Sequence, residues 1–145
     1  MNEAKASLWQ AIELLAACIP FSKEKVEAAL PTRIVDTEAP GGDVFQFLEG
    51  SPVPLSDGAR IARLDLRIRR EAGHPGFLVL ELEGRCVSLD EVREHYPTLR
   101  LVGLPRGRSL DESTTHAATT AWGQLSFGFK ERHPACLASV AFDPA

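Results

Sequence analysis

The sequence has few cysteines and none of the spacings that cysteine chemistry usually shows. Its three cysteines, Cys18, Cys86 and Cys136, include no CxxC pair, so neither a disulfide framework nor a paired-cysteine zinc site is expected. Cys18 lies in the apolar stretch LLAACIP and Cys136 in CLASVAF, where a free thiol is expected to pack as a small apolar group. The alternative is one bridge between Cys86 and Cys136.

Long apolar runs and an excess of positive charge are also missing. The apolar stretch at residues 8–19 is interrupted by Gln10 and Glu13, is too short to span a bilayer, and lacks the flanks of a signal peptide. The net charge is −4, so nothing concentrates polyanions around the chain, and neither nucleic acid nor a membrane is an expected partner. As written the chain is expected in the cytoplasm. A periplasmic protein whose export signal had been removed would have the same sequence.

The common reaction signatures do not occur. The sequence contains no GxSxG, HExxH, GxGxxG or GxxxxGK[ST] pattern. His133 lies three residues before Cys136, but two ligands do not make a structural zinc site, and a catalytic cysteine would also need a histidine base and a lowered thiol pKa. We therefore expect no catalytic residue, no metal and no cofactor.

What is present is an ordinary globular composition, with 44% hydrophobic and 25% charged residues among 145. One domain spanning residues 1–145 is expected. Leu8, Ile12 and Leu15 recur at helical spacing and predict a helix over residues 3–17 that ends before Pro20. Ser22 is expected to cap a second, short helix that ends at Leu30, and the two helices are expected to form a hairpin over residues 3–30.

Alternating apolar residues dominate the rest of the chain. Ala62, Leu64, Leu66 and Ile68 alternate with charged residues, and residues 77–84, 120–130 and 136–142 show similar patterns, with shorter candidates at 44–50 and 99–104. A capping box from Ser88 to Glu91 predicts one inserted helix. The expectation is an α+β fold, with a mainly antiparallel sheet of about five strands and the inserted helix over residues 44–143, and with the helices covering one face.

The apolar residues at the centres of the predicted strands are expected to form the core, and the residues that alternate with them are expected on the exposed face of the sheet. Leu66, Leu80, Phe127 and Val140 are expected in one core beneath the N-terminal helices. Outward arginines at positions 63, 67 and 69 can serve as a charged face that opposes aggregation, or can meet an acidic partner.

The second candidate surface is the polar stretch at residues 103–119, which is long for a connection and is therefore either disordered or functional. Together with the outward strand face it gives a hypothesis for partner binding. The residues predicted to contact an acidic protein surface are Arg63, Arg67, Arg106 and Arg108.

Over residues 60–143 the segments GFLVLELEGRCVSLDEVREHYP, WGQLSFGFKE and CLASVAFDP give an order of elements that resembles small α+β immunity proteins of bacterial type VI secretion and related toxin systems. The resemblance implies a protein that binds and blocks a cognate toxin, frequently in the periplasm. It transfers no functional positions. A small enzyme of unknown reaction and a secretion-system accessory or chaperone are the alternatives, and a homo-oligomer is compatible with each.

Overall fold

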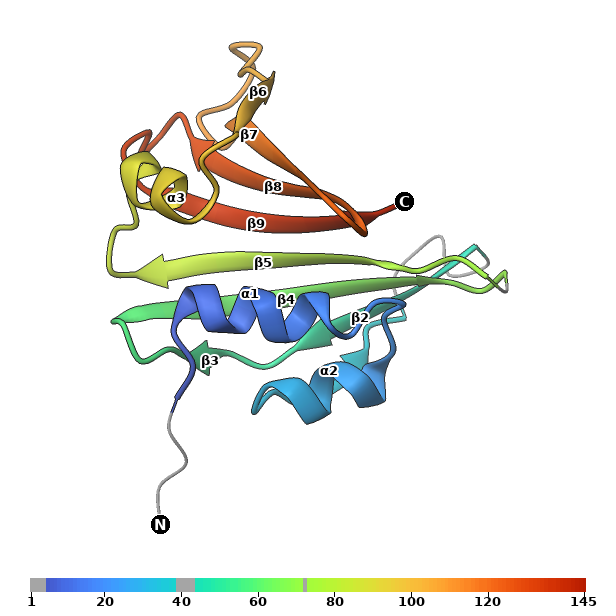
Figure 1. The fold of residues 1–145 in the computed structure, drawn as a ribbon. Coiled ribbons are helices and arrows are strands. Elements are labelled where there is room, and N and C mark those ends of the chain that lie inside the picture. The colour runs from blue at the N-terminus through green and yellow to red at the C-terminus, as the bar shows by residue number, and fades with distance from the viewer. Residues whose placement is uncertain (1–4, 39–43, 72) are drawn as a thin grey trace.

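The computed structural model describes residues 5–38, 44–71 and 73–145, and within them the chain forms an α+β fold of three helices and nine strands (Figure 1). The helices are α1 (Leu8–Ala16), α2 (Lys23–Ala29) and α3 (Leu89–His95). The strands are β1 (Ile34–Asp36), β2 (Phe45–Gly50), β3 (Val53–Pro54), β4 (Ala59–Arg69), β5 (Phe77–Gly84), β6 (Arg100–Gly103), β7 (Ser113–Thr120), β8 (Gly123–Lys130) and β9 (Leu137–Pro144).

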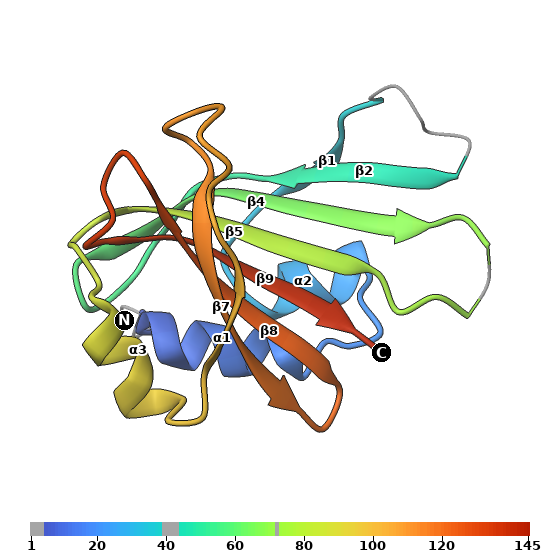
Figure 2. The same ribbon diagram turned by 90° about the horizontal axis from the view of Figure 1, so that it is seen from above.

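All strand pairs in the sheet are antiparallel. The order is β1-β2-β4-β5-β9-β8-β7-β6, with β3 paired to β4 beside β2. The sheet twists strongly, so that β7 crosses the direction of β4 at a steep angle (Figure 2). The expected count of about five strands is wrong because β1, β3 and β7 were not predicted. β1 and β3 have three and two residues, too few to show an alternating pattern.

β7 replaces much of the polar loop expected at residues 103–119. Ser113–Thr120 pairs along its whole length with β8, from Ser113 opposite Lys130 to Thr120 opposite Gly123. The segment STTHAATT has no apolar alternation, but its threonines are β-branched and suit a strand whose backbone is paired on both sides. The remaining connection is the short loop at residues 104–112.

Local capping sets where the helices begin. Ser7 Oγ accepts a hydrogen bond from the Gln10 amide at 3.1 Å, and Gln10 Oε1 accepts one from the Ser7 amide at 2.9 Å, so α1 begins at Leu8 and not at residue 3. Residues 3 and 4 of the predicted helix lie outside the described residues. The Ser22 cap of α2 is confirmed, since Ser22 Oγ accepts from the Lys25 amide at 3.2 Å.

The expected helical hairpin is wrong. Both N-terminal helices lie on one face of the sheet (Figure 1), and α1 uses its apolar stripe of Leu8, Ile12 and Leu15 in the core. Val26 is the one fully buried side chain of α2. Neither helix therefore retains an apolar face for a packed two-helix unit.

The predicted core is confirmed. Leu66, Leu80, Phe127 and Val140 have no exposed surface, and Leu80 pairs with Val140, which pairs with Phe127. The prediction that alternate residues of β4 face the core is correct at Leu64 and Leu66 but wrong at Ala62. A register shift between Ile61 and Arg63 makes Ile61 the buried residue instead. Such a bulge adds one residue to a strand and reverses which face the earlier side chains occupy.

A hydrogen-bonded network joins α3 to α1 and to the turn before β4. Ser88 Oγ caps α3 at the Glu91 amide, as expected, but the Glu91 carboxylate does not return to Ser88. It accepts two bonds from the Arg85 guanidinium at 2.7 and 3.0 Å and one from Trp9 Nε1 at 3.1 Å. Arg85 lowers the pKa of Glu91 below its ordinary value, because it binds the ionised carboxylate.

Candidate protein-binding surface

The helix-free face of the sheet carries the predicted arginine stripe, but its arginines are paired within the chain. Arg63 Nε lies 2.8 Å from Glu49 on β2, and Arg63 Nη1 lies 3.9 Å from Glu81 on β5. The Arg67 guanidinium lies 3.4 Å from Asp65 and 5.3 Å from the centre of the Phe47 ring. The contacts with Glu49, Glu81 and Phe47 connect β4 to neighbouring strands, and the contact with Asp65 lies within β4. They support the interpretation of a charged strand face more than that of a free cationic stripe.

Half-buried aromatic rings lie on the same face beyond Arg67. Phe45 lies 6.1 Å from both Phe47 and Phe77, measured between ring centres, and His74 lies 4.9 Å from Phe77. Rings at these spacings stabilise one another while part of each stays accessible. The face therefore combines paired charges with a small apolar cluster.

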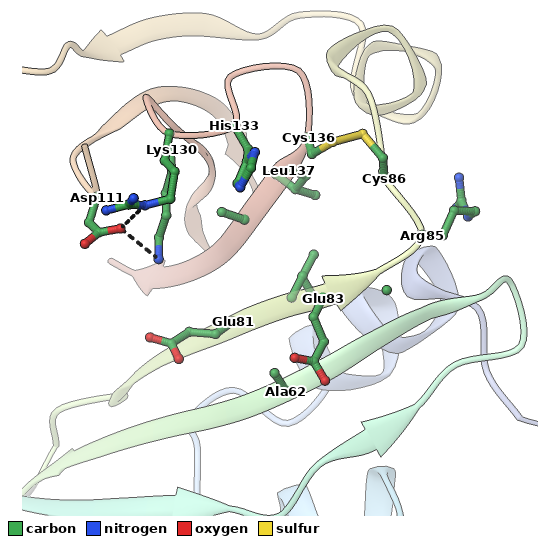
Figure 3. Close-up of a pocket in the computed structure, with 14 residues that line it drawn as sticks. Ala62, Glu81, Glu83, Arg85, Cys86, Asp111, Lys130, His133, Cys136 and Leu137 are labelled. Atoms are coloured by element: carbon green, nitrogen blue, oxygen red, sulfur yellow. Dashed lines mark hydrogen bonds and ion pairs between the residues drawn. A yellow bond between two sulfur atoms is a disulfide. The ribbon is translucent and has the colours of Figure 1, made fainter.

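At the opposite end of this face, a cleft of about 410 Å³ is bounded by two parts of the chain (Figure 3). Glu81 and Glu83 form one wall, and Lys130 and Asp111 form the other. Arg132 also lines the cleft. Asp111 pairs with Arg132 at 3.2 Å and with Lys130 at 4.0 Å, and the hydrogen bond from Arg132 lowers the pKa of Asp111. Glu83 pairs with Arg60. The charges of both walls are thus largely balanced.

A disulfide between Cys86 and Cys136 closes one end of this cleft (Figure 3). The expectation that Cys136 packs as a free core thiol is wrong, and the alternative bridge is present. Cys18 is the free, buried thiol of the chain, and its burial raises its pKa. His133 lines the cleft, yet both nearby sulfur atoms are bonded to each other, so the cleft holds no thiolate nucleophile.

The described side chains do not form a group that could hold a metal ion. Within residues 5–38, 44–71 and 73–145, no three histidine, cysteine, aspartate or glutamate side chains converge as metal ligands. In the same ranges no helix is long and apolar enough to cross a membrane.

The loop at residues 104–112 is ordered by a single carboxylate. Glu112 accepts hydrogen bonds from the amides of Arg108 at 2.7 Å, Ser109 at 3.0 Å and Arg106 at 3.1 Å, and these bonds lower its pKa below the ordinary value. The Arg132 amide also donates to the Leu110 carbonyl at 2.9 Å. Hydrogen bonds within the loop therefore order it, and one further backbone hydrogen bond connects it to the chain just after β8. The loop projects to the side opposite α1 (Figure 2).

The side chains of Arg106 and Arg108 take no part in that internal arrangement, which uses only their backbone amides. Both residues are exposed, and among the described residues no carboxylate forms an ion pair with either guanidinium. Glu112, the nearest carboxylate in sequence, is occupied by backbone amides. Two guanidinium groups are thus displayed on an ordered loop with their donors available to another molecule.

Exposed apolar residues concentrate beside these arginines. Of the seven large hydrophobic residues exposed in the described chain, four lie within ten positions on β6 and its loop, namely Leu101, Val102, Leu104 and Leu110. Leu104 is 65% exposed and Leu101 is 53% exposed. We call these four residues, together with Arg106 and Arg108, the β6-loop surface. Several large apolar side chains left in water by one short segment make that segment a candidate interaction site.

The sequence predicted two residues of the β6-loop surface. Arg106 and Arg108 were predicted and lie on it, whereas Arg63 and Arg67 lie on β4, five strands away in the sheet order. The leucines were missed because LRLVGL has the composition of an ordinary buried strand. Only the position of β6 at the end of the sheet leaves them exposed.

The chain is therefore an α+β protein whose antiparallel sheet is covered by helices on one face and open on the other. Comparisons with protein-family models, with curated proteins and with solved structures found no match to this chain.

Proposed function

We propose that this chain is a protein-binding module and, in particular, an immunity protein that binds and inhibits a cognate bacterial toxin through the β6-loop surface. The β6-loop surface carries this proposal, because exposed leucines beside unpaired arginines on an ordered loop are the kind of group that supplies binding energy at protein interfaces. Arginine and large apolar side chains contribute most to the free energy of binding when they become buried together in an interface.

The order of the loop supports the same function. A loop held by Glu112 before a partner arrives loses little conformational freedom on binding. The cleft beside it offers a second contact, since Asp111 connects the loop to the cleft wall. A toxin could therefore meet apolar, cationic and cleft contacts within one region.

The disulfide supports an oxidising compartment, and we propose the periplasm. Cys86 is exposed to solvent, and bridges of this kind form and persist where thiols are not kept reduced. The expectation of a cytoplasmic protein rested on sequence features that say nothing about the bridge. Trapping of free thiols on the protein taken from cells should find Cys18 alone reactive after unfolding. Three reactive thiols would contradict the periplasmic proposal.

The binding experiment uses the product of the reading frame adjacent to the gene for this chain as the candidate toxin. Calorimetric titration of the two purified proteins should give a complex, and Arg106→Glu with Arg108→Glu should weaken it at least tenfold. The matched control reverses two exposed charges elsewhere, Lys23→Glu with Arg33→Glu, and should leave the affinity unchanged. No complex, or equal losses in both variants, would contradict the proposal.

A further inference from the structure

β6 forms one edge of the sheet and has a neighbour on one side only. It pairs with β7, with Arg100 opposite Ala117 and Leu101 opposite His116, and among the described residues no strand follows it in the sheet. In an antiparallel strand, alternate residues direct their amide and carbonyl groups away from the paired neighbour. The outer side of β6 therefore presents backbone donors and acceptors to solvent.

The side chains of β6 protect this edge only in part. Natural edge strands are usually shielded by charged residues, by proline or by a covering segment. Arg100 begins β6 and Pro105 lies two positions after it, and the register shift between Leu101 and Gly103 shortens the length over which a straight strand can pair. Leu101 and Val102 are nevertheless exposed, and Leu104 follows β6 directly.

We propose, building on the proposed function, that β6 receives an extended segment of the partner protein as an additional strand, and that this segment carries acidic residues among apolar ones. Backbone hydrogen bonds to β6 would supply the common part of the affinity, and contacts with Leu101 and Leu104 would supply the apolar part. Arg106 and Arg108 would pair with carboxylates of the segment as it passes the loop.

Charge favours a partner protein over a second copy of this chain. In a two-fold antiparallel pairing of β6 with itself, the loop that follows β6 in one copy would approach the start of β6 in the other. That start is Arg100, so Arg106 and Arg108 would meet another arginine. The Glu112 carboxylate is directed at the amides of Arg106, Arg108 and Ser109 inside its own loop, so it does not lie between the arginines of the two copies. An acidic segment meets no such penalty.

The test uses a fluorescent synthetic peptide of alternating valine and glutamate and measures its affinity by anisotropy. We expect saturable binding in the millimolar range or tighter, weakened at least tenfold by Arg106→Glu with Arg108→Glu and unchanged by Lys23→Glu with Arg33→Glu. A second peptide, N-methylated at alternate amides, lacks the donors that strand addition needs and should bind at least tenfold more weakly.

Three results would overturn strand addition. They are equal binding of a valine and lysine peptide, equal binding of the N-methylated peptide, and a dimer of the free chain in light scattering that Leu101→Lys abolishes. If the adjacent-gene product still binds in a manner that depends on Arg106 and Arg108, the proposed function stands and only this binding mode fails. If neither the peptide nor that protein binds, both proposals fail.

Discussion

The two ends of the sheet are built differently. At the β1 end, the Ile34 amide donates to Glu27 of α2 at 2.9 Å, while the Asp36 carboxylate accepts from the Glu38 amide at 2.8 Å and from Gln46 at 3.1 Å. The Glu27 side chain thus occupies one of the edge positions that another strand would need, and Asp36 ties the end of β1 to β2 and to the residue that follows, although Val35 is exposed. At the β6 end, apolar side chains lie in solvent beside an unpaired backbone edge.

This difference shows that protection of a sheet edge is a local property of a few side chains. β1 is short, buries Ile34 and is covered by a carboxylate from a helix. β6 has a comparable length, but it has no buried residue, and no carboxylate of a helix accepts a hydrogen bond from it among the described residues. An open apolar edge favours pairing with another chain, and this is the reason for the proposal that a partner covers β6.

The largest effect is expected from the disulfide, which encloses α3, β6, β7 and β8 between its two cysteines. Replacing Cys86 and Cys136 together by serine should lower the free energy of unfolding by about 4 kcal/mol, because a cross-link across 50 residues restricts the unfolded chain. Urea unfolding of the oxidised protein and the variant measures this loss. Equal midpoints would show that the bridge does not stabilise the β6 half of the molecule.

A second prediction compares one apolar side chain from each edge. Ile34→Ala should cost about 2–5 kcal/mol of unfolding free energy, because Ile34 is 1% exposed and its removal leaves a cavity. The matched change Leu101→Ala at the β6 end should cost no more than about 0.5 kcal/mol, since that side chain lies in solvent. Similar losses for the two variants in urea unfolding would contradict the contrast between the edges.

The carboxylate that covers β1 provides a third prediction. Glu27→Ala leaves the Ile34 amide without its acceptor and should cost about 1–3 kcal/mol, while Glu27→Gln keeps an oxygen in place and should cost less. Glu24→Ala, on the exposed first turn of the same helix, is the control. Thermal unfolding of the three variants should rank Glu27→Ala as the least stable. Any other order would mean that Glu27 does not protect this edge.

The smallest effect concerns the loop beside β6. Hydrogen bonds from three amides lower the pKa of Glu112, so its stabilisation of the loop is complete above the ordinary glutamate pKa and is lost as the pH falls through the lowered value. The amide resonances of Arg106, Arg108 and Ser109 should therefore shift together in acid, and Glu112→Gln should shift them at neutral pH. Constant resonances in both experiments would show that Glu112 does not order the loop.

The sequence predicts the sheet centre well because one-sided burial imposes a period of two there. Leu64, Leu66, Leu80 and Phe127 follow this rule and are buried as expected. Ala62 breaks the rule, because a bulge depends on how two strands align and leaves no mark in either strand alone.

The edges and the bridge could not be predicted in the same way. β7 is held by its pairing with β8 and not by an apolar pattern, so Ser113–Thr120 resembles a loop in the sequence. The bridge depends on Cys86 meeting Cys136 after four intervening elements. Arg106 and Arg108 could be identified as candidates from their residue type, but whether an arginine is already paired is decided by strands distant in sequence, as Arg63 and Glu49 show.

Amide hydrogen exchange at both edges, with and without the valine and glutamate peptide, tests the central claim most directly. The account predicts that Leu101 and its neighbours on β6 exchange rapidly in the free protein and become protected when the peptide binds, while Ile34 is protected in both states. Unchanged exchange on β6 with bound peptide, or new protection on β1 instead, would contradict it.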